Sequence, residues 1–165
     1  MSDALHDEPP APLEADPALM VQALARRIAT RTMADVAADV GGAVRESDGY
    51  VFQHLLPGPL TIGELAERLG ITQQGASKAV SDMERRGLVR REPDGRDRRV
   101  RRVSLTSTAI EAVVAARRSR AGVADLIEQE LGTRRAASFR RALVDLLSAT
   151  GADSDLRDRS VPAPD

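Results

Sequence analysis

The sequence contains no cysteine and no tryptophan, and aromatic residues make up only 2% of its 165 residues. The absence of cysteine excludes disulfide bonds, thiolate-bound zinc and regulation by thiol oxidation. Because aromatic side chains are so scarce, Leu, Val, Ile and Ala must fill the core, and this composition favours helices. Apolar runs of membrane-spanning length are also missing, and the start, "MSDALHDEPPAPLEADP", lacks the features of a signal peptide. The sequence therefore predicts a soluble, cytoplasmic protein with no membrane partner.

The usual signatures of catalysis are missing as well. His6 lies in the proline-rich start, which leaves His54 as the only histidine of the expected folded region. There is no phosphate-binding glycine loop, no nucleophile elbow and no cluster of metal ligands. Acidic pairs such as Glu64 and Glu67 stand at the spacing of a solvated helix face. We therefore expect no enzyme activity, no cofactor and no metal site.

The folded region lies between two polar ends. Residues 1–19 hold five acidic residues and four prolines but no Lys or Arg, a composition typical of disorder, so we assign residues 1–16 to a disordered N-terminal arm. Residues 151–165 form a polar C-terminal tail. The remaining residues, 17–150, suit one domain of ordinary size.

Two long helical segments are expected at the edges of this region, over residues 17–41 and 107–150. The first ends at Gly41-Gly42, and the second is expected to break at Gly132-Thr133. Both carry apolar residues at the 3.6-residue spacing of a helix face. These residues include Val21, Leu24, Ile28, Val36, Val40, Ile110, Val113, Val114, Phe139, Leu143, Leu146 and Leu147.

Two short helices with the spacing of a helix-turn-helix stand between the long ones. Thr61 and Glu64 form a capping box, in which the Thr61 hydroxyl accepts the Glu64 N–H and the Glu64 side chain reaches back. Ala66 is small where a second helix must cross, Gly70 supplies the positive φ of the turn, and Thr72 caps the next helix. The expected core of this unit is Leu65, Leu69, Ile71, Ala76 and Val80. A plain helical hairpin is the alternative.

A strongly basic hairpin follows. Two β-type runs, residues 88–92 and 99–106, flank the turn "PDGRD". Because Val100 and Val103 are not in simple alternation, the second strand is expected either to start at Arg101 or to carry an irregularity. Nine of the eighteen residues from Arg85 to Arg102 are arginine and three are acidic, so this window carries +6 while the whole chain carries −1. A solvated surface usually mixes both signs. A basic hairpin after a helix-turn-helix indicates a winged helix that binds DNA.

The candidate DNA-binding residues come from the helix and from the hairpin. Glutamine can pair with adenine, lysine with guanine, and serine with a base or a phosphate in the major groove. Arg96, next to the turn, could enter an A/T-rich minor groove, with Asp94 either orienting it or serving only as a turn residue. Because strand side chains alternate, about half of a set of four arginines are expected to contact phosphates and the others to pair with acids such as Glu92; the set is Arg98, Arg99, Arg101 and Arg102. The candidates are Thr72, Gln73, Gln74, Ser77, Lys78, Asp94, Arg96, Arg98 and Arg99.

From about residue 17 to 150 the chain resembles the multiple antibiotic resistance regulator (MarR) family of winged helix-turn-helix transcription factors. The resemblance is carried by "LTIGELAERLGITQQGASKAVSDMERRGLVRREPDGRDRRVRRVSLT", and most specifically by Asp94-x-Arg96-Asp97-x-Arg99 followed by Val103-x-Leu105-Thr106. Ala109 departs from the pattern, which usually has glycine there, and we expect it to straighten the entry into the following helix. The resemblance implies a mainly α fold with a small β-hairpin wing. Its DNA-binding lobe would cover residues 57–106, and dimerisation helices would cover residues 17–41 and 107–150.

The resemblance also implies a homodimer, which typically represses transcription from a pseudo-palindromic DNA operator. Many members of the family release DNA when a small, often aromatic or phenolic, anion binds between the dimerisation helices and the DNA-binding lobe. Tyr50 and His54 are candidate ligand-binding residues, on a short helix that Ser47 is expected to cap, although a buried histidine at a junction is the plainer interpretation of His54. The apolar stripes of the long helices independently favour a dimer over a monomeric helical layer.

Two other functions stay open at this stage. One is a nucleoid-type DNA binder with little sequence preference, in which Gln73, Gln74 and Lys78 would be unimportant. The other is a winged helix that contacts proteins. The operator, the regulated genes, the effector and the sign of regulation are not encoded in recognisable residues.

Overall fold

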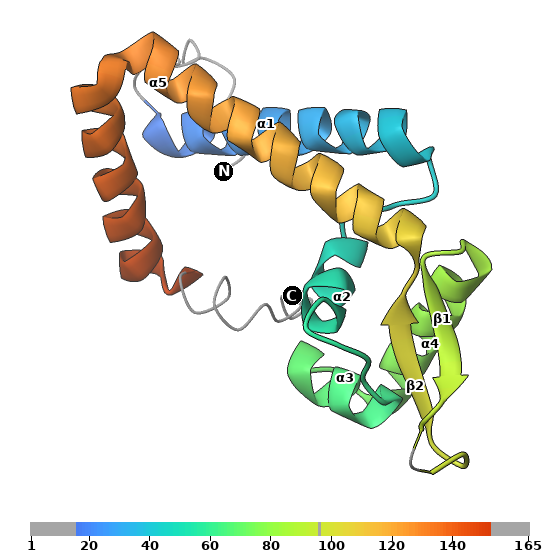
Figure 1. Ribbon diagram of the computed structural model, residues 1–165. Coiled ribbons are helices and arrows are strands. Elements are labelled where there is room, and N and C mark those ends of the chain that lie inside the picture. The colour runs from blue at the N-terminus through green and yellow to red at the C-terminus, as the bar shows by residue number, and fades with distance from the viewer. Residues whose placement is uncertain (1–15, 96, 153–165) are drawn as a thin grey trace, which may run out of the picture.

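The computed structural model describes residues 16–95 and 97–152, so most of the expected N-terminal arm and polar tail lies outside it. The fold is mainly α with one antiparallel hairpin, as predicted. Its elements are α1 (Pro17–Val40), α2 (Asp48–Leu55), α3 (Ile62–Leu69), α4 (Gln73–Arg85), β1 (Val89–Pro93), β2 (Arg101–Leu105) and α5 (Ser107–Thr150). In Figure 1, α5 crosses α1, and the two form a helical layer from which the remaining elements hang as a winged-helix lobe, residues 48–105.

The two helices of the helical layer begin with side-chain caps. Asp16 accepts a hydrogen bond from the Leu19 N–H at 2.9 Å before α1, and Thr106 accepts one from the Ala109 N–H at 3.3 Å before α5. The predicted break at Gly132 is a sharp bend within α5, visible in Figure 1. Gly132 has φ 72° and ψ 156°, which glycine adopts without steric cost. The chain resumes its helical path after the bend.

The helix-turn-helix forms as the sequence predicts. The Glu64 N–H donates to Thr61 Oγ1 at 3.2 Å and the Thr61 N–H donates to Glu64 Oε2 at 2.7 Å, which completes the capping box. Gly70 ends α3 with φ 68°, and Thr72 Oγ1 accepts the Gly75 N–H at 3.1 Å. The local turn chemistry therefore fixes where α3 ends and α4 begins.

The prediction that Ser47 caps α2 is wrong. Ser47 has helical φ and ψ and its side chain makes no capping bond. The carboxylate of Asp48 is bonded there instead, since its Oδ2 accepts the Arg45 N–H at 2.8 Å. Asp48 also pairs with Arg86, the residue that directly follows α4, and this pair holds its carboxylate in the interior.

The hairpin pairs Val89 with Leu105 at its base and Pro93 with Arg101 near its tip. The second strand begins at Arg101, as the irregular valine spacing suggested. Val100 lies in the turn, where its carbonyl accepts the Asp94 N–H at 2.9 Å. A short bridge between Leu60 and Val103 adds the chain after α2 to the edge of the hairpin.

The core predicted for the helix-turn-helix is present in the structure. The predicted core residues Leu65, Leu69, Ala76 and Val80 are buried, and Ile71 is half-buried beside them. Ala109 is fully buried in the first turn of α5. Among the described helices, none is both long and apolar enough to cross a lipid bilayer.

Candidate DNA interface

The start of α4 presents polar side chains outward. Gln74 and Lys78 are exposed, and Ser77 is half-buried with its carbonyl accepting the Ser81 hydroxyl at 2.9 Å. Gln73 is exposed but its amide lies over the first turn of α3, since a Cβ added at Gly63 would be 3.3 Å from Gln73 Nε2. Gln74 and Lys78 are consequently the freest of the predicted side chains to reach a DNA base.

Gly75 has an internal structural role. A Cβ at this position would lie 3.3 Å from Thr72 Oγ1, the atom that caps α4. A glycine costs a helix about 1 kcal/mol relative to alanine. Here it leaves room for the cap, so its presence does not require a nearby DNA backbone.

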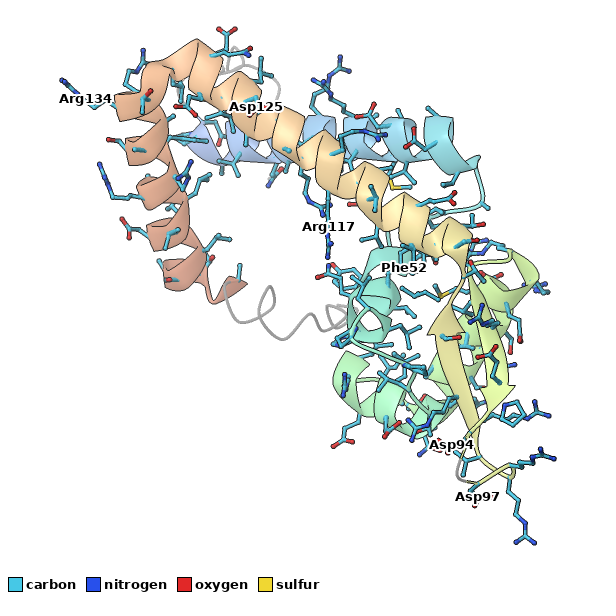
Figure 2. The ribbon with its side chains drawn as sticks, viewed as in Figure 1. Phe52, Asp94, Asp97, Arg117, Asp125 and Arg134 are labelled. Carbon is cyan, nitrogen blue, oxygen red and sulfur yellow. The ribbon has the colours of Figure 1, made fainter. Side chains whose placement is uncertain are left out.

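The wing tip is a network of local turns around two acids. Asp94 and Asp97 lie at the end of the hairpin that is farthest from the helical layer (Figure 2). Asp97 accepts the Arg99 N–H at 2.9 Å, which turns the chain back toward β2. Arg98 and Arg99 are exposed, and neither makes an ion pair within the part of the chain that is described. Arg96, predicted as the minor-groove residue, lies outside the described residues.

Other arginines of the basic cluster are bonded within the protein. Arg91 joins β1 to α4, since its guanidinium donates to Glu84 Oε2 at 3.0 Å and to Ser81 Oγ at 2.9 Å. On the exposed face of β1, Arg90 pairs with Glu92 at 2.9 Å. Arg90 and Arg91 thus both pair with acids. The division expected among Arg98, Arg99, Arg101 and Arg102, between phosphates and acids, stays a prediction.

Arg102 braces the wing against the helix-turn-helix. Its Nε donates to Asp94, and its Nη1 lies 3.2 Å from the carbonyl of Pro59 and 3.5 Å from Glu64 Oε2. The hydrogen bond to Asp94 is the main cause that raises the pKa of Arg102. Hydrogen bonding to the Thr61 backbone lowers the pKa of Glu64, so both partners stay charged. Asp94 therefore positions the outer part of the wing through Arg102, whatever it does for Arg96.

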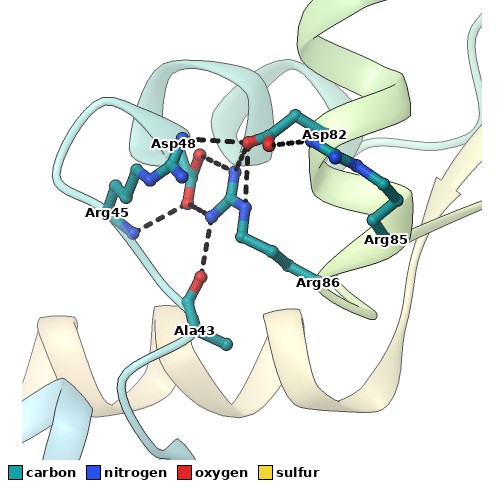
Figure 3. Close-up of polar contacts among 6 residues, drawn as sticks. All are labelled: Ala43, Arg45, Asp48, Asp82, Arg85 and Arg86. Atoms are coloured by element: carbon teal, nitrogen blue, oxygen red, sulfur yellow. Dashed lines mark hydrogen bonds and ion pairs between the residues drawn. The ribbon is translucent and has the colours of Figure 1, made fainter.

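The C-terminal end of α4 carries a second ionic network, drawn in Figure 3. Arg86 makes a two-pronged contact with Asp48 at 2.5 and 2.9 Å, and its Nε donates to Asp82 at 3.0 Å. The hydrogen bond to Asp48 raises the pKa of Arg86 against the opposing effect of burial. Burial disfavours the charged form of Asp82, but Arg86 and Arg45 outweigh it and lower the pKa of that carboxyl.

The sequence did not predict this network, although it held one signal. Asp48 stands three residues before Val51 and four before Phe52, which are both buried, so it occupies the apolar face of α2. An acid on an apolar face needs a partner, because burying an unpaired charge is costly. Its partner, Arg86, follows 38 residues later, beyond the reach of any local pattern.

The two candidate ligand-binding residues lie on α2. His54 is buried and Tyr50 is half-buried against the core. Neither residue lines the two surface depressions along α1. The larger, about 600 Å³, includes Arg26, Met33 and Glu46; the smaller, about 280 Å³, lies between Asp35 and Asp39 of α1 and Ser119 of α5. An effector site at Tyr50 and His54 stays a prediction.

Comparison with known proteins agrees with this geometry. Residues 48–100 match the family model described as the MarR family. Among curated proteins, no match was found.

Several solved structures share the fold. YusO from Bacillus subtilis is 21% identical, with 86% of this chain and 99% of that chain covered and a TM-score of 0.66. MepR of S. aureus in its DNA complex is 19% identical, with 79% and 95% covered and a TM-score of 0.66. FabT of Streptococcus pneumoniae, also in complex with DNA, is 13% identical, with 81% and 94% covered and a TM-score of 0.64. At such low identities these likenesses show the fold. The family match over residues 48–100 and the shared fold support a winged-helix regulator of the MarR family.

Proposed function

We propose that the protein binds a pseudo-palindromic DNA operator as a homodimer and reads its sequence. In each subunit α4 enters the major groove and the wing lies along the backbone toward the neighbouring minor groove. The solved complexes of MepR and FabT with DNA support this arrangement by analogy of fold.

One observation carries the proposal. Gln74 and Lys78 on α4, together with Arg98 and Arg99 on the wing, are exposed, whereas Arg86, Arg91 and Arg102 are bonded internally. Some arginines of the basic cluster thus hold α4 and the wing in place, and others are accessible to a polyanion such as DNA. Gln74 and Lys78 carry the groups that pair with adenine and guanine.

The dimer is proposed from the helical layer. Within the described residues, the large hydrophobic side chains that are exposed all belong to α1 and α5: Leu19, Met20, Val21, Leu24, Ile110, Val114, Leu126, Val144 and Leu146. A second copy of the layer would remove them from water. A dimer would also present two α4 helices, which matches a pseudo-palindromic site.

We extend the proposal to repression, because a dimer bound across a promoter excludes other proteins from that DNA. An effector that releases the operator is the finer expectation from the family. Tyr50 and His54 are the residues to test for it.

A binding titration at several salt concentrations tests the proposal. The selected operator should compete far better than random DNA of equal length. If each subunit neutralises about four phosphates, the logarithm of the binding constant should fall with the logarithm of salt concentration with a slope near −7. Lys78→Ala and Gln74→Ala should each cost roughly 1–3 kcal/mol at particular base pairs and little at others.

Equal losses on every sequence would instead favour a binder without sequence preference. Absence of DNA binding would favour a winged helix that contacts proteins. Arg96→Ala tests the residue outside the described range: it should flatten the slope by about two units per dimer and weaken the preference for A/T-rich flanks. Arg96→Lys should restore the slope more than the flank preference.

A further inference from the structure

The C-terminal end of α4 is where both covalent links between the lobe and the helical layer meet. The first link is residues 41–47, between α1 and α2. The second is Thr106, between β2 and α5. Thr106 Oγ1 donates to the Gly87 carbonyl at 2.7 Å, and its N–H donates to the Leu88 carbonyl at 3.1 Å.

Arg86 ties the same end of α4 to the first link. Its Nη1 donates to the Ala43 carbonyl at 2.7 Å as well as to Asp48. Arg45, in the same link, reaches back to Asp82 of α4 at 2.9 Å. Figure 3 shows these groups converging on one guanidinium from the link, from α2 and from α4.

The contact between Arg86 and Asp48 is buried and has a defined geometry. The side chain of Arg86 is 16% exposed and that of Asp48 is 6% exposed. A planar guanidinium that grips a carboxylate with two parallel bonds fixes direction as well as distance. A lysine at this position would keep the charge and lose the two-pronged geometry.

We infer that Arg86, held by Asp48 and Asp82, is a positioning residue that sets the direction of α4 relative to the helical layer and thereby the half-site spacing that a dimer accepts. This rests on the proposed function, since it requires two α4 helices on one operator. In a two-fold dimer the helical layer holds the two lobes apart. Any freedom at the end of α4 becomes freedom in the distance and angle between the two reading helices.

The experiment uses the full chain and an operator selected from random DNA with the wild-type protein. Binding is measured on this operator, on versions with one base pair inserted or deleted at the centre, and on a single half-site. One base pair rotates a half-site by about 35° about the DNA axis, so the wild type should discriminate sharply among the spacings. Arg86→Lys should reduce this discrimination by roughly tenfold and leave single half-site affinity unchanged.

Two further variants keep the result interpretable. Asp82→Asn removes the partner that is 25% exposed, so it perturbs the buried core less than Arg86→Lys does, and it should give a smaller loss of discrimination in the same direction. Arg85→Lys is the matched control, because Arg85 is the neighbouring arginine, is 78% exposed and, among the described residues, bonds only Asp82. It should discriminate like the wild type.

Each outcome decides something. Unchanged discrimination in folded Arg86→Lys would overturn the inference, and so would an equal loss on the single half-site, which would indicate a DNA contact or general damage. If Arg86→Lys does not fold, Asp82→Asn decides by the same criterion. If the wild type selects no sequence at all, it is the proposed function that fails.

Discussion

The winged-helix lobe and the helical layer bury their apolar residues in opposite ways. The largest fully buried side chains, Leu65, Leu69, Val80, Met83, Leu88 and Val103, all belong to the lobe. The helical layer contributes mainly small residues to the interior, such as Ala112 and Ala115, and exposes its large ones. The lobe buries its large apolar side chains within one chain, whereas the layer leaves an apolar surface exposed, which favours the proposed dimer.

Polar groups differ between the two regions in the same way. In the lobe, ion pairs join different elements, as between Arg86 and Asp48 or between Arg91 and Glu84. In the layer, the described polar contacts between helices are few, with Ser119 donating to Asp35 at 2.6 Å and Arg118 paired with Asp39. The lobe is therefore held together in detail by contacts within one chain, whereas the layer has few such contacts and leaves its apolar surface for the proposed dimer.

The largest expected effect comes from removing part of the layer. Deletion of residues 133–165 takes away exposed Val144 and Leu146 together with the rest of the chain after the bend. We expect the dimer to be replaced by monomer or aggregate at micromolar concentration, as measured by sedimentation or light scattering. A soluble, fully folded monomer formed by the undeleted chain would break the comparison.

The next effect contrasts one core residue with one exposed residue. Leu65→Ala leaves a cavity in the lobe and should cost about 2–5 kcal/mol of unfolding free energy. Val144→Ala, at a side chain that is 56% exposed in the single chain, should act mainly on dimer dissociation. Chemical denaturation at two protein concentrations separates the two effects. Comparable, concentration-independent losses in both variants would contradict the proposed division.

A smaller effect separates the helix caps of the two regions. Thr72→Ala removes the cap of α4 and should cost about 1 kcal/mol, because α4 cannot fray without disturbing the lobe core. Asp16→Ala removes an equivalent bond at the start of α1, where Leu19 and Met20 are already exposed. Thermal unfolding should show a smaller loss for Asp16→Ala. The reverse order would mean that the start of α1 is buried in the assembled protein.

The smallest effect is a pH dependence in the lobe. Folding lowers the pKa of Glu64 from its ordinary 4.5, so its contribution is present above that pH and is lost as the pH falls through the lowered value. Glutamine can keep the hydrogen bonds of the capping box without the charge. Glu64→Gln should thus melt slightly below the wild type at neutral pH, and the two melting curves should converge in acid. A gap that persists at acid pH would show that the charge is not the cause.

Local features of this protein were determined by the sequence alone. The capping box of Thr61 and Glu64, the turn at Gly70 and the cap at Thr72 all join residues at most three or four apart, where side-chain chemistry acts directly on the backbone. The hairpin position and the core of the helix-turn-helix followed from the same short-range patterns. The cap predicted at Ser47 is absent because Ser47 has helical φ and ψ, and the neighbouring Asp48 accepts the Arg45 N–H instead.

Only the tertiary structure decided which arginines of the basic cluster hold the protein together and which face outward. Arg86 and Arg102 look like any other member of "ERRGLVRREPDGRDRRVRR", yet each is bonded to a residue 38 positions away. Ion pairing depends on distance in space and on burial, and neither can be read from neighbours in the sequence. The charge of the cluster is therefore a property of the sequence, whereas the fold decides which of its arginines form internal ion pairs and which stay exposed.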